Sequence, residues 1–398
     1  MLSLLERIAA IEPELVGYRR QIHQHPEPGF EEKETTRLIC QVLDEANIPY
    51  HSNGDKTGVI ATLTGAKPGK VVALRADIDA LKQTEQTGLE FSSQVPGVCH
   101  ACGHDIHTAT LMGAARVLSE YRDQLCGTIR FLFQPAEETL GGSRSMIENG
   151  ALIDPPVDYL LAAHTWPDMP AGSVGVRKGG MLAASDHFVI TVRGKSGHAA
   201  HPHRCIDPIV IGAHIITELQ TIVSRRVAPV DSAVVSIGRL TAGNVSNVIQ
   251  TEAVMEGTVR TLDAGTRENI RAWMEKMVTL TAEAMGGEAQ LDYEYGVPPV
   301  SCDSYIVDCV SQAVTELLGP DKLLQVPTPS MGGEDFSFYM EKAPGAFIRL
   351  GTADERPESK GALHSPTTVF NEKAIATGVA ALVGTAFLLT GTGLDPLK

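Results

Sequence analysis

The sequence predicts an α/β protein with a mostly parallel central sheet and a smaller, inserted ferredoxin-like domain. Three observations support this prediction. Apolar strand patterns alternate with helical patterns in residues 1–183. Residues 184–298 follow the order β-α-β-β-α-β. The α/β character returns in residues 299–398, so we expect the first and third segments to form one domain around the insertion.

The elements of the larger domain follow from hydrophobic periodicity. An amphipathic helix is expected near the N-terminus, where Ser3 and Glu6 have the spacing of a capping box. The uncharged run 374–394 is rich in Ala, Gly and Thr, which disfavours a membrane span, so we expect a helix packed on the sheet. Further helices are expected at 31–46, 104–121 and 142–149, and strands at 59–63, 71–77, 128–133 and 159–164.

The inserted segment has its own helix signals. Asp207-Pro208 has the pattern of an N-cap followed by a first helical residue, and Gly286-Gly287 is typical of a helix end. The expected helices are 207–225 and 266–285, and the expected strands are 187–194, 233–240, 248–261 and 289–295.

Composition excludes several functional classes. The formal net charge is −15 and no basic patch is visible, which argues against a nucleic-acid partner. The N-terminus is charged from Glu6 onward and lacks the apolar region of a signal peptide. The seven cysteines follow no framework, which indicates free thiols in a reducing compartment. We therefore expect a cytoplasmic protein with no membrane partner.

Polar side chains follow the predicted strands of the larger domain. Asp77 and Asp79 come at the end of one strand, and Glu137 and Glu138 follow the next. His164 ends a third strand, Cys102 and His104 open a helix, and His364 lies in a loop after an apolar strand. Because ligands in open α/β sheets bind beyond the carboxyl ends of the strands, we expect these residues to meet at one edge.

The converging residues offer sulfur, nitrogen and oxygen donors. Singly, a cysteine or histidine is most often a packing residue, and adjacent glutamates are most often solvated. Jointly, the set suits zinc, manganese, cobalt or nickel, and its size suggests two ions. His100 and His107 are possible partners that orient the ligands. The expected ligands are Cys102, His104, Glu138, His164 and His364.

Eight motifs in order resemble the M20 metallopeptidase family, in its branch of aminoacylase- and hippurate-hydrolase-like amidohydrolases. They are RADIDAL (75–81), HACGHDIHTA (100–109), QPAEE (134–138), HTWP (164–167), GKSGHAAHPH (194–203), GTVRT (257–261), MGGEDFS (331–337) and LHSP (363–366). Lys82, Cys99 and Gln250 depart from the usual pattern, but none of these departures removes a ligand.

The resemblance implies a catalytic α/β domain and an inserted lid that often dimerises, hence a homodimer or higher oligomer. It implies two divalent metal ions, most simply zinc or manganese, on the five ligands named above. Glu137 would be the general base, and Asp77 would orient a metal ligand. In the lid, His198 would polarise the scissile carbonyl, and Asn247 and Arg260 would hold the substrate carboxylate.

The expected reaction is hydrolysis of an N-acyl amino acid, such as an N-acetyl or N-benzoyl compound, by a metal-activated water. The products would be a carboxylic acid and a free amino acid. A dipeptidase or carboxypeptidase on the same fold is an alternative. A thiol hydrolase with Cys102 as nucleophile, and a metal-stabilised binding protein without activity, are further alternatives.

Overall fold

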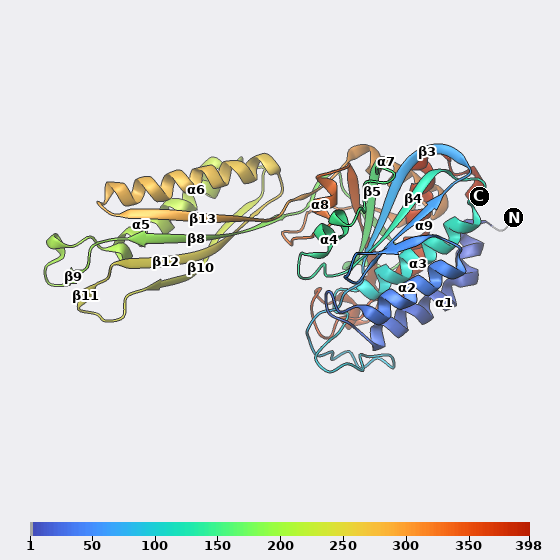
Figure 1. Ribbon diagram of the computed structural model, residues 1–398, viewed down its shortest axis with the longest axis horizontal. Helices are drawn as coiled ribbons and strands as arrows, with labels where there is room; N and C mark the ends of the chain where they lie inside the picture. The colour runs from blue at the N-terminus through green and yellow to red at the C-terminus, as the bar shows by residue number, and fades with distance from the viewer. Residues whose placement is uncertain (1–2) are drawn as a thin grey trace. The chain divides into compact units, whose positions relative to one another are not determined.

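The chain divides into two compact units (Figure 1). The structure, a computed structural model, describes residues 3–398. The first unit comprises the chain up to Gly179 together with Cys302–Thr328 and Asp335–Lys398. The second comprises Gly180–Ser301 and Pro329–Glu334. The chain passes between them near β7 (Gly179–Leu182) and β14 (Val300–Cys302).

The structural division differs from the expected one at residues 180–183 and 299–301, which fall in the second unit, and at one further segment of the range 299–398. Pro329–Glu334 belongs to the second unit. Ser330 donates its backbone N–H to Met181, and Ala183 donates to Gly332. These bonds join backbone groups far apart in sequence, and hydrophobic periodicity carries no signal for them.

The first unit is built on an eight-stranded mixed sheet whose central strands β4, β3, β5 and β16 are parallel. At one side β1 and β2 join in antiparallel fashion, and at the other β6 is antiparallel to β16. The α/β prediction with a mostly parallel core is confirmed. In spatial order the strands are β1 (Tyr50–Ser52), β2 (Val59–Thr64), β4 (Cys126–Gln134), β3 (Lys67–Asp77), β5 (Tyr159–Pro170), β16 (Gly345–Ala353), β6 (Val174–Val176) and β15 (Leu323–Gln325).

Helices of the first unit pack beside this sheet, with α1, α3 and α9 in mutual contact (Figure 1). The capping box predicted at Ser3 and Glu6 is present at the start of α1. The helices are α1 (Leu4–Gln24), α2 (Lys33–Glu45), α3 (His104–Glu120), α4 (Gly142–Glu148), α7 (Ser304–Leu317), α8 (Ser337–Met340) and α9 (Lys373–Thr390).

Helix α9 corresponds to the uncharged run near the C-terminus. Within residues 3–398 it is the one helix long and apolar enough to cross a membrane, yet 83% of it is buried inside the protein. Its glycines explain the composition. A Cβ on Gly378 would lie 2.6 Å from Thr110 of α3, and one on Gly384 would lie 2.5 Å from Leu317 of α7. The small residues therefore serve close helix packing.

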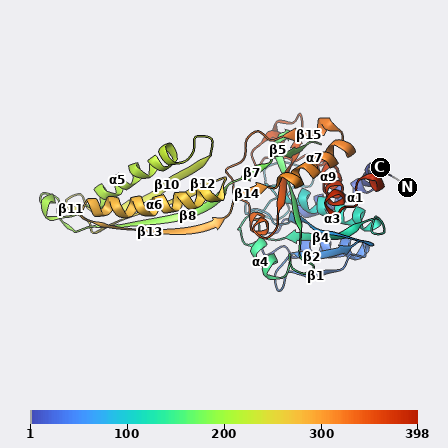
Figure 2. The same ribbon diagram turned by 90° about the horizontal axis from the view of Figure 1, so that it is seen from above.

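The second unit is an antiparallel sheet in the order β10-β12-β8-β13, with α5 and α6 packed on one face (Figure 2). Numbered along the chain, the strands lie in the order 2-3-1-4, so the predicted β-α-β-β-α-β arrangement is confirmed. Asp207 caps α5, as expected. The elements are β8 (Ala184–Arg193), α5 (Pro208–Thr221) with a π-helical turn (Ile222–Arg226), β10 (Ala233–Ala242), β12 (Glu252–Thr261), α6 (Ala264–Ala284) and β13 (Glu288–Val297), plus the short pair β9 (Gly197–His198) and β11 (Val248–Ile249).

Candidate metal centre

The parallel strands of the first unit bring the predicted ligands together. In three overlapping groups the potential ligand atoms lie within 4.8 Å of one another. All five expected ligands are included, together with Asp77 and Glu137. The groups are Asp77, His104, His107 and His164; Cys102, Glu138 and His364; and His104, Glu137 and Glu138.

His164 lies inside β5, which runs on to Pro170, although the sequence predicted the strand to end at this residue. The pairing of β5 with β3 stops at Ala162, whereas its pairing with β16 continues to Pro170. His164 therefore lies just beyond the edge shared with β3, where Asp77 ends the neighbouring strand.

His104 and His164 each present one ring nitrogen to the cluster. Nδ1 of His164 lies 2.8 Å from the carbonyl of Thr165, and Nδ1 of His104 lies 3.0 Å from the carbonyl of Asp79. A carbonyl only accepts, so Nδ1 of each ring carries a proton and Nε2 is the nitrogen left for the cluster. Nε2 of His104 is buried and has no hydrogen-bond partner among residues 3–398.

His107 lies in the same group, but both of its ring nitrogens are engaged. Its Nε2 accepts the backbone N–H of Thr165 at 2.7 Å, so the proton is on Nδ1, which lies 2.5 Å from Asp77 Oδ1. His107 thus contacts Asp77, and the role considered for it from sequence, that of orienting an expected ligand, stays a prediction. His100 is also buried, but neither ring nitrogen has a hydrogen-bond partner within the described chain, and burial lowers its pKa to about 3.

The surroundings of Cys102, Glu138 and His364 stabilise a positive charge. Nε2 of His364 lies 3.3 Å from Glu138 Oε1, and Cys102 Sγ lies 3.4 Å from His164 Nε2. Hydrogen bonding to Cys102 and Glu138 raises the pKa of His364 to about 10. Burial opposes ionisation of Glu138, yet His364 and His104 hold its pKa below its usual value. An environment that stabilises an imidazolium this strongly also suits a divalent cation.

These residues pass a chemical test for a metal site. Burial raises the pKa of the Cys102 thiol, so a nearby cation is the group best able to hold it as a thiolate. The unpartnered Nε2 of His104 is the kind of atom that a metal satisfies. Thiol, imidazole and carboxylate donors together match borderline cations such as zinc.

Asp79 contacts two of the expected ligands, although the ligand prediction left it out. Its carboxylate lies 3.2 Å from His104 Nδ1 through Oδ1, and its Oδ2 accepts the backbone N–H of Glu138 at 3.0 Å. One side chain thus holds two expected ligands. The available signal was its spacing two residues beyond Asp77, which places both carboxylates on one side of an extended chain.

The predicted substrate residues all belong to the second unit. The pairing of β9 with β11 sets His198 opposite Val248, and Ala199 donates its N–H to the carbonyl of Asn247. His198 is exposed, and its Nδ1 accepts the backbone N–H of Ala200. Arg260 lies on β12, half-buried. The roles expected for these three residues stay predictions.

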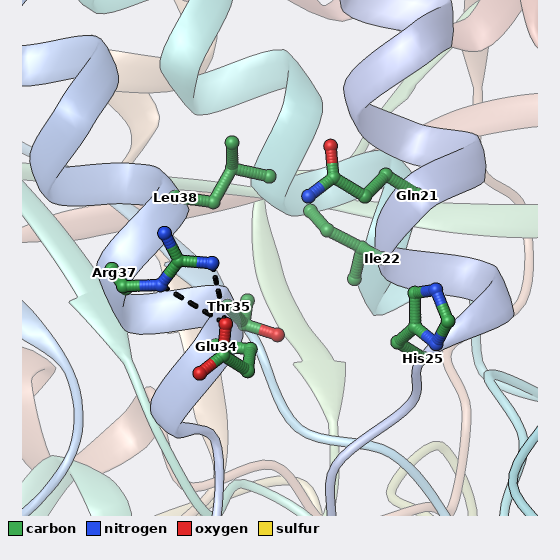
Figure 3. A pocket seen from close by; sticks show the side chains of 7 residues that line it. All are labelled: Gln21, Ile22, His25, Glu34, Thr35, Arg37 and Leu38. Carbon is green, nitrogen blue, oxygen red and sulfur yellow. Dashed lines mark hydrogen bonds and ion pairs between the residues drawn. The ribbon is translucent and has the colours of Figure 1, made fainter.

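A surface pocket of about 380 Å³ lies between α1 and α2 (Figure 3). Arg37 and Glu34 form an ion pair along one side of it. None of its lining residues is an expected ligand, so it is separate from the candidate metal centre. The lining residues are Gln21, Ile22, His25, Glu34, Thr35, Arg37 and Leu38.

Comparison with known proteins places the chain among metal-dependent hydrolases. Residues 73–387 match the family model "Peptidase family M20/M25/M40". The chain is 41% identical over 370 residues to N-acetyl-L-cysteine deacetylase of Bacillus subtilis, covering 92% of this chain and 86% of the relative. It is 43% identical over 291 residues to N-acyl-L-amino acid amidohydrolase of Geobacillus stearothermophilus, covering 73% and 78%.

A solved structure agrees with these relatives. The crystal structure of a dinuclear metal-binding M20 peptidase from Bacillus subtilis superposes with a TM-score of 0.84 at 37% identity, covering 96% of this chain and 99% of that one. The matches extend over nearly the whole chain and include the segments that carry the candidate ligands. The protein therefore belongs to peptidase family M20/M25/M40 and is a metal-dependent amidohydrolase or peptidase.

Proposed function

We propose that the protein hydrolyses the amide bond of N-acyl amino acids to a carboxylic acid and a free amino acid. The main support for this proposal is the donor cluster, in which Glu137 lies beside Glu138 and His104. The potential ligand atoms of these three residues lie within 4.8 Å of one another. The names of the two relatives, a deacetylase of N-acetyl-L-cysteine and an N-acyl-L-amino acid amidohydrolase, support the substrate class.

Cys102, His104, Glu138, His164 and His364 would hold two divalent cations. Such cations would supply Lewis-acid activation of water and positive charge for the developing oxyanion. Asp77 would orient the donor set, and two neighbouring side chains hold its carboxylate in place. Its Oδ2 accepts from Arg75 Nη1 at 2.6 Å, and His107 holds Oδ1. Burial opposes ionisation of Asp77, but His104 and Arg75 hold its pKa well below the usual value.

Glu137 would act as the general base and general acid of the reaction. Glu137 is 6% exposed, which shields a general base from bulk water. It would take a proton from the attacking water and deliver it to the leaving nitrogen. His198 would polarise the scissile carbonyl, and Asn247 and Arg260 would bind the substrate carboxylate through charge-assisted hydrogen bonds.

A thiol mechanism is less well supported. A nucleophilic cysteine needs a thiolate, which requires a lowered pKa and an accessible sulfur. Cys102 is buried, and burial raises its pKa. The position of Cys102 among imidazoles and a carboxylate favours a ligand over a nucleophile.

A substrate panel combined with metal removal tests the proposed function. The protein is assayed with N-acetyl and N-benzoyl amino acids and with dipeptides, before and after EDTA, and after addition of zinc or manganese. We expect hydrolysis of the N-acyl compounds, loss of activity with EDTA and recovery with metal. Activity that survives chelation would contradict the metal mechanism, and preference for dipeptides would favour a peptidase.

Substitution of the general base provides a second test. Glu137→Gln should lower kcat by about 10²–10⁴-fold, because the amide cannot accept the proton. Its bound metal should equal that of the wild type. Glu138→Gln is the matched control on the adjacent residue and should lose metal as well as activity. A Glu137→Gln variant with near wild-type kcat would refute the assignment.

A further inference from the structure

The loop that follows β4 sets the direction of Glu137 and Glu138. Ala136 adopts a left-handed backbone conformation, with φ of 52°, directly before them. Its carbonyl accepts the N–H groups of Gly141 and Gly142, which closes the turn. A non-glycine residue in this region is strained and persists only where its surroundings enforce the conformation.

Glu32, 104 residues earlier in the sequence, helps to enforce that conformation. This residue is fully buried and lies directly before α2. Its Oε1 accepts the backbone N–H of Ala136 at 2.9 Å, and its Oε2 accepts the hydroxyl of Thr57. Gly29 brings the segment close, because a Cβ there would lie 2.9 Å from the Cα of Ala136.

The buried carboxylate of Glu32 is costly for folding. Burial raises its pKa to about 7, and the nearby charge of Asp79 also raises it. Ionised Glu32 therefore opposes folding at neutral pH. One of its two hydrogen bonds, from Ala136, is formed at the turn that presents the acidic pair, which is consistent with a role in the site and not in stability alone.

We propose that Glu32 is a positioning residue, whose carboxylate fixes the Ala136 turn so that Glu137 and Glu138 face the metal centre. The inference rests on the proposed function for the role of Glu137. The hydrogen bond to Ala136 acts on the backbone between Pro135 and Glu137, so its loss would let both glutamates shift together.

Variants of Glu32 and of a nearby glutamate separate positioning from folding. Glu32→Ala should lower kcat about 10–100-fold, with KM within threefold. Glu32→Gln keeps an acceptor for Ala136 and a polar group for Thr57, so kcat should stay within threefold and stability at pH 8 should equal or exceed wild type. The control is Glu27→Ala, which removes the carboxylate that accepts the N–H groups of Glu34 and Thr35 at 3.0 and 2.9 Å. It should lower the melting temperature and leave kcat within threefold.

Metal affinity gives a readout that needs no substrate. Zinc binding, measured by competition with a chromogenic chelator, should weaken about tenfold in Glu32→Ala and be unchanged in Glu27→Ala. If the wild type hydrolyses nothing in the panel, the proposed function fails, and zinc affinity still tests the inference. If Glu32→Ala does not fold, Glu32→Asp replaces it, because its shorter side chain cannot hold Ala136 and Thr57 together and should give the same losses.

Two outcomes would overturn the inference. One is a folded Glu32→Ala or Glu32→Asp variant with zinc affinity and kcat within threefold of wild type. The other is a Glu27→Ala variant that loses kcat and zinc affinity in parallel with Glu32→Ala, which would make both effects a general consequence of lost stability.

Discussion

At the scale of single residues, the hydrogen bond on one ring nitrogen decides what the other can do. His104 and His164 each place a proton against a carbonyl and keep Nε2 for the cluster. His107 differs because the N–H of Thr165 occupies its Nε2. Neighbouring histidines with similar burial therefore have different chemistry, and their backbone partners account for the difference.

Two glycine substitutions test whether the close approach of Gly29 to Ala136 matters for activity. Gly29→Ala should lower kcat at least fivefold, because the new Cβ would lie 2.9 Å from the backbone of Ala136 and displace the turn. Gly17→Ala is the control, since nothing lies within 4 Å of a Cβ there and the residue is inside α1. It should leave kcat unchanged and raise stability by about 1 kcal/mol in urea unfolding. Equal kcat in both variants would contradict the close-packing argument.

The sequence predicted which candidate metal ligands lie together, but it did not predict the residues that hold them in place. The convergence of Cys102, His104 and His164 could be predicted because strand ends in an α/β sheet share one edge, which the loop before α3 also reaches. Glu32 could not be predicted, because its bond to Ala136 depends on a left-handed residue that no hydrophobic period marks. His100 was expected to orient a ligand, but within residues 3–398 neither of its ring nitrogens forms a hydrogen bond.

At the scale of elements, the start of α9 is tied to α1 by charge. Glu372, at the N-cap of α9, accepts two hydrogen bonds from Arg20 at 2.9 and 2.8 Å, and one from buried Arg19 at 3.3 Å. Arg19 also contacts Asp105 of α3 at 2.6 Å. The three helices that pack together are therefore joined at one end by a partly buried ionic network.

Stability should depend on Glu372 in a pH-dependent way. Burial opposes its ionisation, but Arg20 and Arg19 hold its pKa below the usual value of 4.5. A lowered pKa means that the contribution is present above about pH 4.5 and is lost as the pH falls further. Glu372→Gln should cost about 1–2 kcal/mol at pH 7 and less near pH 3, in urea unfolding at both values. Exposed Glu341→Gln is the control; an unchanged cost at pH 3 would contradict an ionic origin.

The elements themselves were largely predictable. Helix α3 and strands β2, β3 and β4 follow the expected periodicity, and only their ends move by a few residues. One exception is the expected strand 248–261, which is divided into β11 and β12 because the two parts pair with different strands. Another is β5, which extends past His164 because β16, distant in sequence, continues to pair with it. Strand length set by a remote partner is not encoded in the local pattern.

At the scale of the whole molecule, the second unit has its own hydrophobic core, formed by its sheet and by α5 and α6. Its two ends are close, because Ser185 of β8 pairs with Val297 of β13. Arg267 of α6 secures that end, with Nε donating to Asp186 Oδ2 at 2.9 Å. A separate core and adjacent ends are the features expected of an autonomous domain.

The second unit should therefore fold when expressed alone. A fragment of residues 180–301 should show helical circular dichroism and one cooperative thermal transition. Met255→Asp in the fragment is the control, since it places a charge in the fully buried core and should abolish the transition. A fragment without cooperative unfolding would show that the core depends on the first unit.

The position of β16 also fixes an order of events during synthesis. This strand lies between β5 and β6 in the sheet, although it is made long after both. A ribosome will have released nearly all of the second unit before the gap beside β5 can be filled. His364, the last donor, follows later still. A nascent chain interrupted before residue 345 would carry the second unit on an unfinished sheet and would lack one of the five expected ligands.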